Sequence, residues 1–138
     1  MITSDLVPIG AVNKAYVDIM EKSCSHPRFY TILTGYEIDP KLIRYKIEFG
    51  MSRPYSNVEV KTIYTRYSIL LKLYKAINKL HPKFSNKFKF PSKRWFNNNT
   101  IETANYRMSI LAPFIQQLNQ IPDIQSIKEF NDIFDISD

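Results

Sequence analysis

Residues 57–82 read NVEVKTIYTRYSILLKLYKAINKLHP, and their side-chain pattern predicts a strand followed by a helix. Up to Tyr64 successive side chains alternate between two faces, which is typical of a strand. One face carries Val58, Val60, Thr62 and Tyr64, and the other carries Asn57, Glu59 and Lys61. The following positions have helical spacing, and Pro82 predicts the helix end because proline disfavours a helical residue before it. These helical positions are Leu70, Leu73, Tyr74, Ile77 and Leu80, with Lys72, Lys75 and Lys79 facing away.

Two more strands are expected before this stretch. Residues 29–38 are rich in aromatic and β-branched side chains, and residues 42–49 alternate strictly. In the alternating run one face carries Ile43, Tyr45, Ile47 and Phe49, and the other carries Arg44, Lys46 and Glu48. Asp39-Pro40 is typical of a turn, and residues 50–56 contain the glycine and proline of the next connection. Three consecutive strands with short links predict an antiparallel meander.

The part of the chain after Pro82 is expected to be mostly helical. Residues 83–99 are polar and basic and contain a proline, so they are expected to form a long loop. Residues 101–121 have helical spacing, and Pro113 should kink this helix or divide it. A last helix should start at Pro122-Asp123, with Asp123 as its N-cap. The stripes of these two helices are Met108, Leu111, Ile115 and Leu118, then Ile124, Ile127, Phe130 and Phe134.

These elements predict one α+β domain: a three-stranded antiparallel meander followed by a helical subdomain. The 138 residues suit a single domain, which we assign to residues 28–138. Residues 1–27 are expected to be an N-terminal extension that includes a short amphipathic helix. The apolar positions of that helix are Val12, Ala15, Tyr16, Ile19 and Met20.

Composition excludes several classes of protein. The chain has only three glycines and contains neither GxGxxG nor GxxxxGK[ST], which argues against a Rossmann or P-loop nucleotide site. Cys24 is the only cysteine, which favours a reducing compartment. No apolar run approaches the roughly 20 residues that span a bilayer, and the first residues do not resemble a signal peptide. Any contact with a membrane is therefore expected to be peripheral.

Positive charge is concentrated in one part of the sequence. The chain has a net charge of +6, and residues 61–100 contain ten basic residues and no Asp or Glu. The remaining residues carry nine basic and thirteen acidic side chains, so their net charge is −4. Such segregation favours a polyanionic partner, either nucleic acid or an anionic membrane.

Basic residues occur in a characteristic order around the predicted strand-to-helix junction. Arg66-Tyr67-Ser68 lies at that junction, Pro91 and Lys93 lie in the predicted loop, and Arg107 lies in the following helix. This order, with its strand and helix context, resembles the phox-homology (PX) domain over about residues 28–136. The sequence is thus similar to sorting-nexin-like modules, and the resemblance implies phosphoinositide binding.

The resemblance also implies roles for individual residues. Arg66 would bind the 3-phosphate and Tyr67 would pack against the inositol ring. Lys93 would contact the 1-phosphate, and Arg107 would hydrogen-bond the 4- and 5-hydroxyls. Guanidinium groups suit this chemistry because they donate two parallel charge-assisted hydrogen bonds to phosphate. The sequence departs from the family pattern at Thr65, at Ile69-Leu70, and in having one proline in the loop.

The predicted loop also carries residues suited to a membrane surface. Trp95 and Phe96 are two large apolar side chains in a basic segment, where they would act as a membrane wedge. Lys87, Lys89 and Arg94 would add attraction to an anionic leaflet. The simpler alternative is that both aromatic residues fold back onto the core.

The sequence therefore predicts a non-enzymatic module that binds phosphatidylinositol 3-phosphate and anionic membranes. By the resemblance it would be cytoplasmic, peripheral on endosomes or vacuoles, and part of protein sorting, with a trafficking protein as a further partner. No cofactor or metal is expected, since His26 and His81 are isolated. One alternative is a PX-fold adaptor with weak lipid affinity. The other alternative is a nucleic-acid binder. The sequence contains no nucleic-acid-binding motif, however, and we do not expect nucleic acid as a partner.

Overall fold

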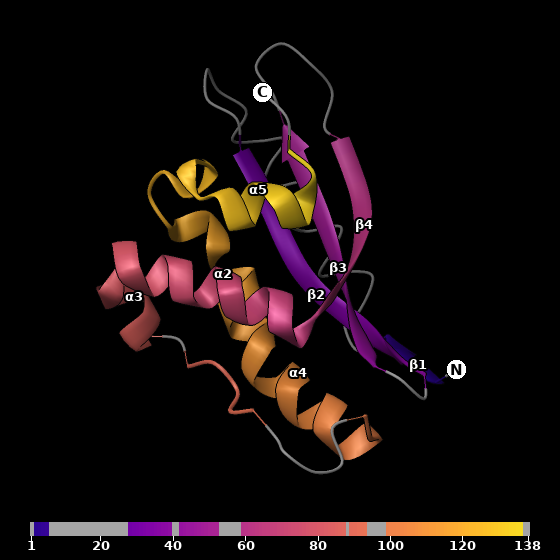
Figure 1. Cartoon of the computed structure of the whole chain (residues 1–138). Coiled ribbons are helices and arrows are strands. Elements are labelled where there is room, and N and C mark those ends of the chain that lie inside the picture. Colours follow the sequence, from indigo (N-terminus) through magenta and orange to yellow (C-terminus); the bar gives the residue numbers. More distant parts are fainter. Residues whose placement is uncertain are drawn as a thin grey trace.

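The computed structural model describes residues 2–5, 28–39, 42–52, 59–87, 89–93 and 99–136. Four strands come first: β1 (Ile2–Asp5), β2 (Arg28–Ile38), β3 (Ile43–Ser52) and β4 (Glu59–Arg66). The helices follow: α2 (Tyr67–Leu80), α3 (Pro82–Lys87), α4 (Ile101–Gln116) and α5 (Lys128–Phe134). Two short 3-10 turns, η1 (Leu118–Gln120) and η2 (Ile124–Ser126), connect α4 to α5. The expected α+β class is confirmed (Figure 1).

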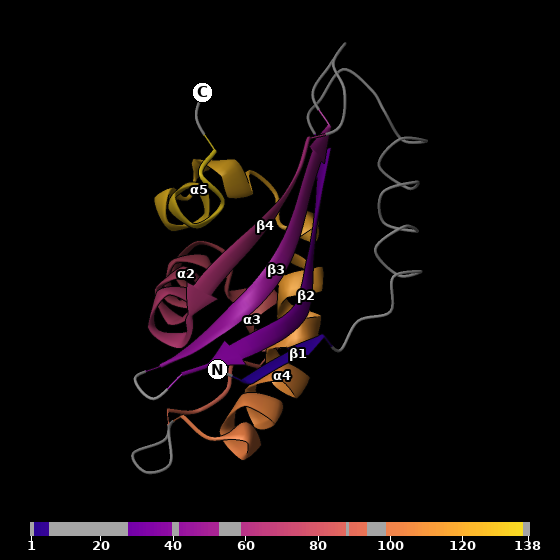
Figure 2. The same ribbon diagram turned by 90° about the vertical axis from the view of Figure 1, so that its right-hand side faces the viewer.

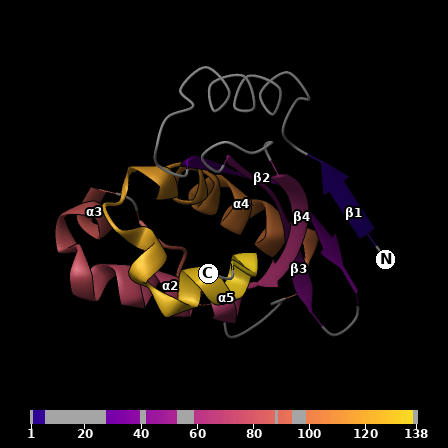
Figure 3. The same cartoon turned by 90° about the horizontal axis from the view of Figure 1, so that it is seen from above.

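The strands form one antiparallel sheet in the order β1-β2-β3-β4. The meander of β2, β3 and β4 is the one expected from the sequence. Strand β1 was not expected. It comes from the first residues of the chain and pairs with the end of β2, where Ile2 lies opposite Ile38 (Figure 3). The rest of the N-terminal extension, including the amphipathic positions 12–20, lies outside the described residues.

Strand β4 faces the core with the side that carries Lys61, Ile63 and Thr65. These residues lie opposite Phe49, Ile47 and Tyr45 of β3, whose side chains are buried. The more apolar side of β4 points outward, so that Val60 and Tyr64 are 44% and 47% exposed. Lys61 can occupy the inner side because its ammonium nitrogen lies over the Phe49 ring, 5.6 Å from the ring centre, and donates to the Asp135 carbonyl at 3.3 Å.

The core lies between the sheet and helices α2, α4 and α5, which cover one of its faces (Figure 2). From the strands it takes the alternating residues of β3, and from α2 it takes Leu70, Leu73 and Ile77. The Thr31 hydroxyl donates to the Ile115 carbonyl and joins β2 to α4. The expected stripes of α4 and α5 are buried as predicted.

The helical half differs from the expectation in three places. The expected loop starts with helix α3, whose first residue is Pro82, since proline suits the first turn of a helix. Helix α4 continues through Pro113 and ends at Gln116, so Pro113 does not divide it. Asp123 does not cap a helix with its side chain, and α5 begins only at Lys128. Asp123 adopts a left-handed conformation with φ of 55°, and its carbonyl accepts from Ser126.

Candidate functional site

The junction of β4 and α2 presents a positively charged helix end. Arg66 is the last residue of β4 and the N-cap of α2, with extended backbone angles of −115° and 160°. Its side chain is exposed and does not cap the helix, and the first turn of α2 contains no acidic residue. The first N–H groups of a helix lack internal partners and carry partial positive charge. This end of α2 therefore suits an anion.

Arg66 also lies directly opposite Arg44 of β3, and both side chains point away from the core. Like charges at such positions repel each other. Arg44 is ion-paired with Asp39 at 3.3 Å. Within the described ranges we find no acidic side chain paired with Arg66. The charge of Arg66 thus remains available to an anionic ligand.

Arg107 enters the same region from α4. Helix α4 starts at Ile101, and its N-cap Thr100 accepts a hydrogen bond from the Thr103 N–H at 3.2 Å. Arg107 lies in the second turn and is 6% exposed. Its guanidinium carbon lies 4.1 Å from the centre of the Tyr67 ring, which is a cation–π contact. Its buried Nε has no hydrogen-bond partner in the part of the chain that the structure describes.

A buried hydroxyl group of β3 faces this arginine. Tyr45 is fully buried, and burial raises the pKa of its phenol, while Arg107, as a nearby hydrogen-bond donor and as a positive charge, partly opposes that shift. Thr65 lies opposite Tyr45 on β4, and its hydroxyl is buried too. Neither hydroxyl has a hydrogen-bond partner among the described residues. The alternation in β3 predicted that Tyr45 is buried, but nothing in the sequence linked its hydroxyl to Arg107.

The segment 89–93 is anchored to α2 through aromatic side chains. The Tyr67 hydroxyl donates to the Pro91 carbonyl at 2.7 Å. The Phe90 ring packs against Tyr67 and Tyr74, with centroid distances of 5.3 Å and 5.0 Å. Pro91 is buried as a result, although it was expected only as a loop proline. These contacts hold the residues next to Lys93 against the start of α2.

The same segment approaches α4. The hydroxyls of Ser92 and Tyr106 lie 3.4 Å apart, and Lys93 follows Ser92 with an exposed side chain. Burial raises the pKa of Tyr67, Arg107 lowers it in part, and Tyr106 raises it further. Thus Tyr67 interacts both with Arg107 and with Tyr106, whose hydroxyl lies next to that of Ser92. The site contains three elements that are distant in sequence: the β4–α2 junction, segment 89–93 and α4.

The predicted site residues are therefore partly brought together. Arg107 covers one face of Tyr67, so only part of that ring is left for a ligand. Arg66 adjoins Tyr67 in the chain, and Lys93 is placed nearby through Pro91. Lys87 and Lys89 are exposed at the end of α3 and in the segment after it. The remaining predictions, Arg94, Trp95 and Phe96, lie outside the described residues.

Comparison with known proteins places this arrangement in a family. The family model described as the PX domain matches residues 53–137. The chain belongs to the PX family. PX domains are in general phosphoinositide-binding modules that target membranes, and they are not enzymes. The expected resemblance is thereby confirmed.

Solved PX domains have the same fold. A crystal structure of the mouse SNX19 PX domain with bound sulphate ion aligns with a TM-score of 0.59 and 18% identity, covering 80% of this chain and 99% of that one. A designed CISK-PX domain aligns with a TM-score of 0.56 and 21% identity, covering 72% and 92% of the two chains. No curated protein matches the chain in sequence.

Two other kinds of feature are absent from the described part of the chain. Among the described helices none is long and apolar enough to cross a bilayer. The same residues contain no group of three or more His, Cys, Asp or Glu side chains placed to hold a metal ion.

Proposed function

We propose that this PX domain binds phosphatidylinositol 3-phosphate on endosomal or vacuolar membranes and acts there in protein sorting. The observation that carries the proposal is the stack of Arg107 on Tyr67 beside Arg66, which has no acidic partner among the described residues, at the start of α2. An exposed arginine at a helix N-terminus suits a phosphate group. A buried arginine with an unpartnered Nε suits hydroxyl groups that accept a hydrogen bond.

Each residue has a distinct role in this proposal. Arg66 binds the 3-phosphate through charge-assisted hydrogen bonds, each worth roughly 1.5–3 kcal/mol. Arg107 binds the free 4- and 5-hydroxyls, and Lys93 contacts the 1-phosphate. Tyr67 packs against the inositol ring with the part of its own ring that Arg107 does not cover. The bound sulphate of the mouse SNX19 PX domain supports the general point that this fold accommodates a tetrahedral oxyanion.

Contact with the membrane itself would come from residues around the headgroup site. Lys87, Lys89 and Arg94 add about 1 kcal/mol each near an anionic leaflet. Trp95 and Phe96 insert between lipids, and each contributes roughly 1.5–3 kcal/mol when buried. These contributions are needed for useful membrane affinity, because the lipid headgroup alone offers the domain few contacts.

The test is sedimentation of the full chain with liposomes that contain one phosphoinositide at a time, at physiological salt. We expect selective binding to phosphatidylinositol 3-phosphate, which Arg66→Ala weakens at least about tenfold. Lys72→Ala is the matched control, because it removes one exposed positive charge from α2 away from the site. Its binding should stay near that of the unmodified chain.

Two results would overturn the proposal. Equal binding to all anionic liposomes, with equal losses for Arg66→Ala and Lys72→Ala, would reveal a basic surface without a headgroup site. Absence of binding to every phosphoinositide would favour a PX-fold adaptor that recognises proteins. Competition by the soluble inositol 1,3-bisphosphate headgroup separates a lipid site from a nucleic-acid site.

A further inference from the structure

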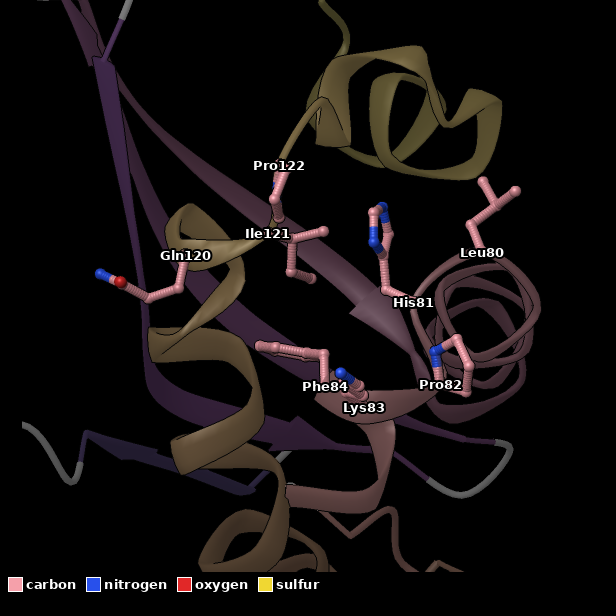
Figure 4. A pocket seen from close by; sticks show the side chains of 8 residues that line it. All are labelled: Leu80, His81, Pro82, Lys83, Phe84, Gln120, Ile121 and Pro122. Carbon is pink, nitrogen blue, oxygen red and sulfur yellow. The ribbon is translucent and has the colours of Figure 1, made fainter.

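A cavity of about 380 Å³ lies at the end of α2 that is remote from Arg66. Figure 4 shows its two walls. The corner between α2 and α3 forms one wall, and η1 with the residues after it forms the other. The lining residues are Leu80, His81, Pro82, Lys83, Phe84, Gln120, Ile121 and Pro122. Its volume falls within the range of about 300–1,000 Å³ that is usual for ligand pockets.

Backbone hydrogen bonds fix both walls of the cavity. On one wall the His81 N–H donates to Ile77 at 2.6 Å, and the Phe84 N–H donates to His81 at 3.1 Å. On the other wall the Ile121 N–H donates to Leu118 at 3.2 Å. The cavity is therefore formed by helix ends that backbone hydrogen bonds hold in place.

The lining is apolar, and part of it is exposed at the rim. Ile121 is 5% exposed, and the Phe84 ring packs against Phe114 with a centroid distance of 6.3 Å. Leu80 belongs to the helical stripe predicted from the sequence, but it is 58% exposed. Leu80 thus extends the apolar lining of the cavity to the protein surface.

The cavity is separate from the proposed lipid site. Tyr67 and Leu80 are the first and last residues of α2. At 1.5 Å per residue, α2 places them roughly 20 Å apart. A ligand of the cavity can thus bind while the other end of α2 faces a membrane.

Positive charge surrounds the cavity on the α2–α3 wall. Lys83 lines it, Lys79 precedes Leu80, and both side chains are exposed. No Asp or Glu occurs in residues 61–100, which include this whole wall. On the other wall the neighbouring acidic residue is Asp123, which follows Pro122 and is exposed. The wall with Leu80 therefore favours a partner that is negatively charged next to an apolar group.

We propose that this cavity is a docking site for an acidic segment of a partner protein. One apolar side chain of the segment enters between Phe84 and Ile121. Asp or Glu residues on either side of it bind Lys79 and Lys83. Charge complementarity with Lys79 and Lys83 selects such a segment over a basic one.

The experiment titrates the full chain with short fluorescein-labelled peptides and follows polarisation and amide chemical shifts. The test peptide has aspartates on both sides of one phenylalanine. Two comparison peptides replace either the phenylalanine by alanine or the aspartates by lysines. We expect only the test peptide to bind with amide shift changes at residues 80, 81, 83, 84, 120 and 121, since Pro82 and Pro122 have no N–H.

Variants then locate the contact. Phe84→Ala removes the ring that the apolar side chain of the peptide would contact, and Lys83→Glu reverses one charge at an exposed position. Each should weaken binding of the test peptide at least about tenfold, the size of a strong interface contact. Lys72→Glu makes the same charge change on α2 two turns away and should change affinity by less than about twofold. Arg66→Ala should leave peptide binding unchanged, which keeps this test independent of the lipid proposal.

Three outcomes would overturn the docking site. Equal binding of the alanine peptide would mean that charge alone attracts the peptide. Equal losses of peptide affinity in Lys72→Glu and Lys83→Glu would mean that the positive surface of the protein attracts the peptide without a specific site. Vesicle binding that falls in Phe84→Ala, with no effect of that change on peptide binding, would assign the cavity to lipid instead.

Discussion

The guanidinium carbon of Arg107 lies 4.1 Å from the centre of the Tyr67 ring, while the hydroxyl of that ring bonds to the Pro91 carbonyl. Tyr67 therefore connects three elements: α2 carries it, α4 covers its face, and segment 89–93 accepts its hydrogen bond. An aromatic residue placed in this way determines the positions of the basic groups around it. The first residue of α2 is thus a structural link as well as a ligand candidate.

Tyr67→Phe should separate these two roles. Phenylalanine keeps the contacts with Arg107 and Phe90 but loses the hydrogen bond to Pro91. We expect the free energy of unfolding in denaturant to fall by about 0.5–1.5 kcal/mol. Vesicle binding should weaken because segment 89–93, with Lys93, is held less firmly. Tyr67→Leu should lose more in both measurements, and equal losses for the two variants would contradict a role for the ring.

Arg107→Met tests whether Arg107 is present for binding or for stability. A buried guanidinium with an unpaired Nε gains little from burial, and an apolar residue of similar length often stabilises such a position. We expect the free energy of unfolding to stay equal or rise while binding to phosphatidylinositol 3-phosphate vesicles falls at least about tenfold. A large loss of stability accompanied by lost binding would mean that Arg107 acts only through the fold.

The strands of the meander and helix α2 were predictable because the side-chain pattern of each has a clear period. Alternation identified the inner face of β3, and helical spacing identified Leu70, Leu73 and Ile77. Strand β1 was missed because Ile2–Asp5 is too short and polar to show a period. The inner face of β4 could not be assigned from residue types, since Lys61 is inside only through its contacts with Phe49 and Asp135.

The site was predictable only as an ordered set of residues. Arg66, Tyr67, Lys93 and Arg107 were chosen by resemblance to a family, and the sequence gives no distance between them. The bond from Tyr67 to Pro91 spans 24 positions, and no local pattern signals a contact over such a separation. The proximity of Tyr45 to Arg107 likewise depends on how α4 packs on the sheet.

Tyr45→Phe should change the response of stability to alkaline pH. The folded state holds the Tyr45 phenol neutral at a pKa above the ordinary value of 10.0. The stabilising effect is full below pH 10 and is lost as the pH rises through the folded pKa, because only the unfolded chain releases this proton readily. The unfolding free energy of the unmodified chain should thus fall more steeply above pH 10.

The measurement is denaturant unfolding of both chains at a series of pH values around and above 10. Near neutral pH Tyr45→Phe should be neutral or stabilising, because it removes a buried hydroxyl without a partner among the described residues. Lysine ionisation affects both chains equally, so the difference between them isolates Tyr45. If the unfolding free energies of the two chains change in parallel with pH, the raised pKa of Tyr45 is contradicted.

Gly50→Ala should destabilise the sheet. Tyr30 of β2 lies opposite Gly50 of β3, and the Tyr30 ring covers the glycine so closely that an added Cβ would collide with its Cε1 and Cζ atoms. The ring is buried, so it can move aside only by disturbing its own packing. We expect the free energy of unfolding to fall by about 1–3 kcal/mol. Thermal and denaturant unfolding of the variant would measure this loss.

The double variant Gly50→Ala with Tyr30→Leu identifies the cause of that loss. Leucine removes the ring atoms that the alanine would meet, so the double variant should lose less stability than the two single changes together. A coupling free energy of about 0.5–3 kcal/mol is usual for residues in contact. Strict additivity would show that Gly50 is needed for some other reason than the Tyr30 ring. In that case the close approach of these two strands would not explain why a glycine occupies this position.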